Sequence, residues 1–188
     1  MIDRPIKVLW LTNNLTPDHA VALGIPPSPR AGWISTLAQA LTADGRVHLA
    51  IATNVYPAAW GKININGVCY YTVPQPKKKI DAHNIPANLI ADYQRVVADF
   101  QPDIMHIHGT EYFHGLLSGN KHLCVPTVIS IQGIIEICAQ HYLEGLPMSA
   151  LLLKRTLRDW VRMDGLLEQQ ISWRRRIACE RKIFAENQ

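Results

Sequence analysis

The sequence contains no apolar run approaching the roughly 20 residues that a membrane-spanning helix requires. Residues 1–7 lead directly into an apolar segment and lack the basic, apolar and small-residue order of a secretory signal peptide. The cysteines form no CxxC motif and no close pair, so a disulfide framework is not expected. These absences predict a cytoplasmic protein with reduced, mostly buried thiols at Cys69, Cys124, Cys138 and Cys179.

Motifs of several common enzyme classes are missing as well. There is no GxGxxG fingerprint and no P-loop, so neither nicotinamide chemistry nor P-loop nucleotide chemistry has support in the sequence. No GxSxG context marks a serine nucleophile, which argues against a hydrolase triad. His106, His108 and His114 lie close together in the sequence, but no carboxylate or cysteine stands at a ligand-like spacing. We therefore predict no metal site.

The net charge of +4 is carried by one part of the chain. Residues 1–150 contain 10 Lys and Arg and 10 Asp and Glu, whereas residues 151–188 contain 9 and 5. The acids are interspersed among the bases, which favours a solvated helix face. Contact with an anionic membrane surface or with the phosphates of a ligand is the alternative. No nucleic-acid partner is expected.

With 188 residues, of which 48% are hydrophobic, the chain is long enough for one domain with a sizeable core. Strand-like runs are predicted at 6–12, 47–52, 62–73 (a hairpin turning at Asn66-Gly67), up to His108 and at 126–131. Helical spacing is predicted at 33–43, 88–100, 110–118 and from Met148 onward, with a break at Asp164-Gly165. This order predicts an α/β fold, a Rossmann-like parallel sheet with helices on both faces, followed by a helical C-terminal segment.

Two strand ends carry polar residues followed by glycine. PDIMHIHGTE ends in His108-Gly109 with Glu111 close behind, and PTVIS continues into Ile131 and then Gln132-Gly133. Ligands of open α/β sheets bind outside the carboxyl ends of the strands, so these ends predict a site. A neutral imidazole at His108 could bind a sugar hydroxyl. Glu111 and Gln132, with the glycines beside them, are candidates for binding donor or acceptor. Alternatively, Glu111 interacts with its helix dipole and Gln132 holds its own loop.

A third candidate lies at Ala31-Gly32, before the first helix. A helix N-terminus with a small residue suits a phosphate or diphosphate, although Gly32 could simply relax the junction. The first strand ends at Asn13-Asn14, and the proline-rich loop 14–30 that follows has the length of a functional lid or a disordered segment. His106, earlier on its strand, is expected to be a hydrogen-bonded core residue.

Taken in order, the opening strand, the loop ending in Ala31-Gly32, the helix from Trp33, PDIMHIHG and PTVISIQG resemble the N-terminal domain of glycosyltransferase family 4. These are retaining enzymes of GT-B fold, in which the N-terminal domain receives the acceptor and a second Rossmann-like domain grips the nucleotide-sugar. The resemblance implies that Gly32 lies near the donor diphosphate and His108 near the sugar hydroxyls. It further implies that loop 14–30 helps to form the acceptor side.

The sequence departs from the family pattern at two positions. Ala31 stands where the family often has the first glycine of a pair, and Gln132 stands where it often has histidine. By the resemblance, residues 1–147 form the acceptor-side domain and residues 148–188 a helical segment of it. We expect the chain to be truncated before the remaining strands and the donor-binding domain.

The implied activity is transfer of a sugar from a nucleoside-diphosphate sugar to an acceptor hydroxyl with retention, in polysaccharide or glycolipid biosynthesis. No metal or other cofactor is expected, and the acceptor is a sugar or a lipid-linked molecule. Basic helices in 151–188 would hold the enzyme against the inner face of the membrane. A sugar-nucleotide 2-epimerase using Glu111, Glu136 or His108 is one alternative. The chain alone could also be a binding module without turnover.

Overall fold

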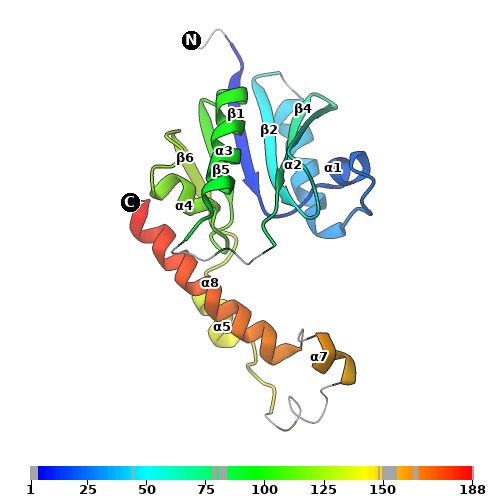
Figure 1. Cartoon of the computed structure of the whole chain (residues 1–188), viewed down its shortest axis with the longest axis vertical. Helices are drawn as coiled ribbons and strands as arrows, with labels where there is room; N and C mark the ends of the chain where they lie inside the picture. The colour runs from blue at the N-terminus through cyan, green and yellow to red at the C-terminus, as the bar shows by residue number, and fades with distance from the viewer. Residues whose placement is uncertain are drawn as a thin grey trace.

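A computed structural model describes residues 4–43, 45–77, 80, 84–147, 149, 156–162 and 165–187. It contains a six-stranded sheet of order β3-β4-β2-β1-β5-β6, parallel except for β3 (Figure 1). The strands are β1 (Ile6–Thr12), β2 (Val47–Val55), β3 (Gly61–Ile65), β4 (Val68–Pro74), β5 (Ile104–His108) and β6 (Thr127–Ser130). The helices are α1 (Pro17–Ala22), α2 (Gly32–Thr42), α3 (Ala87–Phe100), α4 (His114–Gly119), α5 (Ile135–His141), α7 (Leu157–Arg162) and α8 (Leu166–Glu186). The predicted α/β class with a helical C-terminal segment is confirmed.

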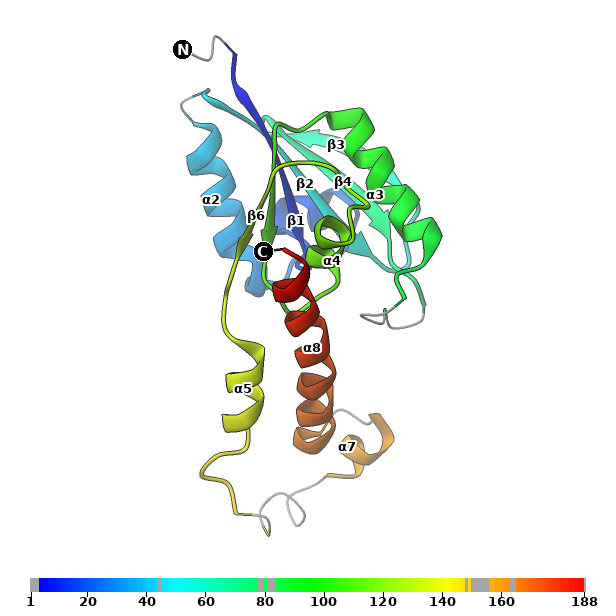
Figure 2. The same cartoon turned by 90° about the vertical axis from the view of Figure 1, so that its left-hand side faces the viewer.

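The central strand β1 separates two hydrophobic cores. Alternate residues of a strand point to opposite faces, so Leu9 and Leu11 enter one core and Trp10 the other. Figure 2 shows α2 on one face of the sheet and α3 and α4 on the other. A strand covered on both faces needs a continuous apolar run, which is why IKVLWLT predicts β1 with its observed bounds.

The hairpin between β3 and β4 turns at the predicted residues. Asn66 and Gly67 have φ angles of 50° and 82°, the left-handed conformation that a tight hairpin requires. Because Val68 then faces the core beside α2, the turn fixes the register of an otherwise exposed edge strand.

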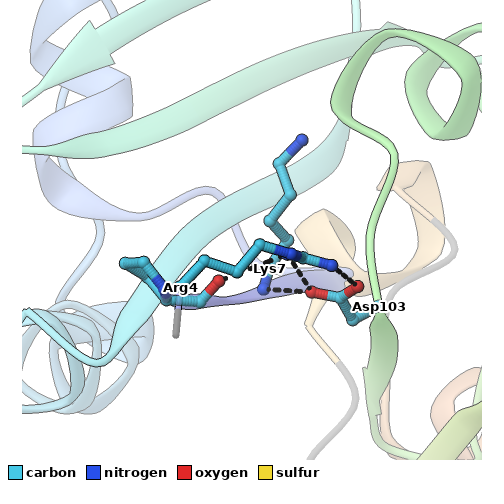
Figure 3. Close-up of polar contacts among 4 residues, drawn as sticks. Arg4, Lys7 and Asp103 are labelled. Carbon is cyan, nitrogen blue, oxygen red and sulfur yellow. Dashed lines mark hydrogen bonds and ion pairs between the residues drawn. The ribbon is translucent and has the colours of Figure 1, made fainter. Parts of the chain in front are cut away.

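An ion pair fastens β5 to β1 at the amino edge of the sheet, away from the predicted site. Asp103, just before β5, accepts hydrogen bonds from the Arg4 guanidinium at 2.6 and 2.8 Å and from the Lys7 backbone N–H at 2.8 Å (Figure 3). The Arg4 bonds, and then the Lys7 N–H, lower the pKa of the Asp103 carboxyl to about 2.

Loop 14–30 is not a disordered segment, which was one of its two predicted forms. It contains α1 and leads into a 3₁₀ turn, Pro29–Ala31. His19 of α1 is fully buried, and its Nε2 makes a 2.8 Å hydrogen bond with Thr72 Oγ1 of β4. The prediction of disorder failed because the buried contact of His19 joins residues far apart in the sequence.

Some other boundaries also differ from prediction. The helix predicted from Thr110 begins at His114, and α5 was not predicted at all. Met148 and Asp164, which mark the predicted helical start and break, lie outside the described residues.

The end of α8 belongs to the main core. Ile183 of α8 is buried there, and a Cβ atom placed on Gly115 of α4 would lie 2.7 Å from it. A Cβ on Gly119, one turn later, would lie 2.6 Å from Glu186. The two glycines therefore let α4 and α8 approach closely. The rest of α8 runs beside α5 beyond the carboxyl edge of the sheet (Figure 2). None of the described helices is both long enough and apolar enough to cross a membrane.

Candidate functional site

The carboxyl ends of β1 and β5 bring three of the predicted residues together. Asn13 Nδ2 donates to Glu111 Oε1 at 3.4 Å, and Asn14 Nδ2 donates to Asn13 Oδ1 at 3.2 Å. The Glu111 carboxylate folds over Gly109, where a Cβ atom would lie 2.3 Å from Oε2. Gly109 also has a φ of 97°. Any larger residue at 109 would push the carboxylate away from the end of β1.

His108 is not open to solvent, contrary to the prediction. The side chain is 5% exposed, and its Nε2 atom is buried without a hydrogen-bond partner. Three rings surround it, with centroids 4.0 Å (His106), 4.7 Å (Trp10) and 5.6 Å (Trp33) away. Burial, assisted by the neighbouring His106, lowers the pKa of His108 to about 4, so the imidazole is neutral at pH 7.

The other two histidines occupy different environments. His106 is half-buried, and its Nε2 makes a 2.5 Å hydrogen bond with Ser130 Oγ of β6. The prediction that His106 is more buried than His108 is therefore wrong. The reason is that Trp33, a residue of α2, covers the end of β5. His114 is buried in a hydrogen-bonded group with Tyr93 and Asn54, and burial lowers its pKa to about 3.

The start of α2 lies next to His108. Trp33 contacts the imidazole, and Gly32 directly precedes Trp33. Nothing lies within 4 Å of a Cβ atom placed on Gly32, and no side chain caps the helix at Ala31. The first turn of α2 thus has no side-chain cap and lies beside open space at Gly32, and a helix start of this kind suits an anion.

Gln132 and Gly133 follow the last residue of β6, Ser130, which pairs with His108 of β5. Gln132 is exposed in the segment between β6 and α5. A Cβ atom on Gly133 would make an ordinary 3.6 Å contact with Cys138 Sγ. The contact of Trp33 with His108 brings the start of α2 next to the end of β5.

Glu180 of α8 is a structural element of the site that the sequence analysis missed. Its side chain is 2% exposed and accepts hydrogen bonds from Thr110 Oγ1 at 2.6 Å, Ile135 N at 3.2 Å and Glu136 N at 3.4 Å. It therefore ties the segments after β5 and β6 to α8. The available signal was its place one residue after the buried Cys179 and three before Ile183, on the packed face of the helix.

Glu136, an acid–base candidate for the alternative epimerase function, forms an ion pair. Its carboxylate binds the guanidinium of Arg181, which lowers the pKa of Glu136. Within the described part of the chain, no three His, Cys, Asp or Glu side chains form a group that could hold a metal ion.

No known family settles the identity of this site. A scan against models of protein families finds no match to the chain, and a search of curated proteins finds none either. The site combines a helix start without a side-chain cap and a neutral imidazole whose Nε2 atom has no hydrogen-bond partner.

Proposed function

We propose that this protein supplies the acceptor-side domain of a retaining glycosyltransferase of family 4. One observation carries the proposal: the contact of Trp33 with His108 places the uncapped start of α2 next to an imidazole with an unpartnered Nε2. A nucleoside-diphosphate sugar presents a phosphate and a hydroxylated ring side by side, and the two features accept one group each.

Each feature would have a separate role in sugar transfer. The N–H groups and dipole of α2 would stabilise the diphosphate as it leaves, which is electrostatic catalysis by groups already in place. The neutral His108 would exchange a hydrogen bond with a sugar hydroxyl and so orient the ring while it acquires oxocarbenium character. The proposal requires no metal ion for either role.

Transfer also needs a group that grips the nucleotide, and the proposal assigns that role to a separate donor-binding domain. This chain alone is then expected to bind nucleotide-sugars weakly or undetectably in calorimetry. Micromolar affinity of the isolated chain for such a donor would contradict this division of roles.

The functional test replaces His108 by alanine in the protein that the whole reading frame encodes. We expect kcat/KM for sugar transfer to fall about ten- to a hundredfold, the effect of losing one hydrogen bond to a buried group. The matched control is His141→Ala, because His141 is exposed on α5. Unchanged transfer by His108→Ala would remove His108 from the site. Formation of an isomeric nucleotide-sugar without any acceptor would identify an epimerase instead.

Peripheral membrane contact forms part of the same proposal. The exposed surface of α7 and α8 combines basic residues, Arg162 and Arg174, with the apolar side chains of Val161, Leu166 and Ile171. Such a surface suits anionic lipid headgroups. Co-sedimentation with vesicles containing phosphatidylglycerol, but not with neutral phosphatidylcholine vesicles, would support the contact. Binding to neither kind of vesicle would exclude it.

A further inference from the structure

Three aromatic rings lie around the buried imidazole of His108, and one of them is exposed to solvent. Of the three rings around it, Trp10 is buried and His106 is half-buried, whereas Trp33 is 45% exposed. Trp33 therefore has His108 on one side and water on the other.

Packing of α2 does not account for a tryptophan at this position. The buried face of the helix is formed by Ile34, Ser35 and Ala38. Trp33 and Leu37, which is 43% exposed, follow each other by one turn outside that face.

We propose that Trp33 is a mobile gate over His108, and that its outward rotation makes the unpartnered Nε2 available to a ligand. A buried polar atom without a partner is costly, so a ligand that supplies the missing hydrogen bond would stabilise the open state. An indole beside such an imidazole suits a ring with an apolar face and a polar edge. That the ring is a sugar rests on the proposed function, whereas the gate rests on the contacts of Trp33 alone.

The test measures how fast diethyl pyrocarbonate modifies each histidine at pH 7, read by peptide mass spectrometry. The reagent attacks neutral imidazole nitrogens, and the buried His19 and His114 report global unfolding. If the Trp33 side chain rotates outward without unfolding of the protein, His108 of the wild-type protein reacts faster than His19 and His114. Trp33→Ala should then raise the His108 rate about ten- to a thousandfold, because an open minor state holds roughly 0.1–10% of molecules. Trp33→Phe should give an intermediate rate.

The matched control is Leu37→Ala, one turn further along the same helix with the same exposure. It should leave the His108 rate unchanged, and none of the variants should accelerate His19 or His114. Two results would overturn the gate: reaction of His108 no faster than the two references, or an unchanged His108 rate in Trp33→Ala. Neither readout depends on sugar transfer, so failure of the gate and failure of the proposed function are distinguishable.

Discussion

Glu180 Oε1 accepts a hydrogen bond of 2.6 Å from Thr110 Oγ1, and 70 residues separate the two along the chain. The same carboxylate receives the N–H groups of Ile135 and Glu136. A buried carboxylate is tolerated when several donors compensate for lost hydration. This contact couples the last helix to the segment that follows His108, so the docking of α8 supports the geometry of the candidate site.

Removal of this carboxylate should destabilise the protein strongly. We expect Glu180→Ala to lower the free energy of unfolding by about 2–4 kcal/mol, because three donors lose their acceptor and a cavity remains. Glu180→Gln should cost less, since an amide oxygen can still accept from Thr110. Urea denaturation measures both effects, with the exposed Glu144→Gln as control, expected to change stability by less than about 0.5 kcal/mol. A cost for Glu180→Ala as small as that of the control would contradict the role of the carboxylate.

The close approach of α4 and α8 gives a second prediction. Gly115→Ala would place a methyl group 2.7 Å from Ile183, and overpacking in a buried interface costs about 1–3 kcal/mol. Gly32→Ala is the matched control, because its new methyl group meets open space and should leave stability unchanged or slightly raised.

A second variant tests whether the contact between residues 115 and 183 causes the loss of stability. Ile183→Ala removes Cγ1, Cγ2 and Cδ1, the three atoms that crowd the new methyl group, and should recover part of the loss in the Gly115→Ala background, although it destabilises the wild-type protein. A double-mutant cycle from urea denaturation measures this coupling. Strictly additive effects would show that the contact between residues 115 and 183 is not the source of the cost.

Three buried histidines predict that the protein loses stability in mild acid. Burial lowers the pKa of His19 and His108 to about 4 and of His114 to about 3, from an ordinary value of 6.5. Below pH 6.5 the unfolded chain therefore binds protons that the folded chain does not. The free energy of unfolding should have its full value above pH 6.5. It should fall as the pH drops toward 4, by up to about 1.4 kcal/mol per pH unit for each histidine.

The measurement is a series of urea titrations between pH 7 and pH 4.5. His114→Gln should reduce the slope of stability against pH by about 1.4 kcal/mol per unit at the acidic end, since one titrating group is gone. Gln39→Ala, at an exposed position of α2 and without a titrating side chain, should leave the slope unchanged. Stability that is independent of pH across this interval would mean that the buried histidines become protonated without unfolding.

Much of the fold was predictable from local patterns. The apolar run of β1 and the Asn66-Gly67 turn specify their conformations through neighbouring residues, and both predictions are confirmed. The amphipathic spacing of α3 did the same to within one residue of its start. The helix α1 within loop 14–30 was not predicted, because its position depends on the contact between His19 and Thr72.

The candidate site was predictable as a place but not as an arrangement. Strand order brings the ends of β1 and β5 together, and the sequence predicted polar residues there. Which of these residues would be covered depended on Trp33, whose role as a cover for His108 no local pattern indicates. Gln132 was predicted to follow a strand end in the same way as His108, yet Gln132 is exposed and His108 is buried.

By itself the sequence determined the kind and order of the strands and of the helices α2, α3 and α4, since periodicity, turn residues and glycines act over a few neighbouring positions. Only the tertiary structure decided which polar side chains are buried and with whom. His108 beneath Trp33 and Glu180 beside Thr110 are the two cases that matter for the site. The physical reason is that burial and hydrogen bonding depend on segments that meet only when the whole sheet and its covering helices have assembled.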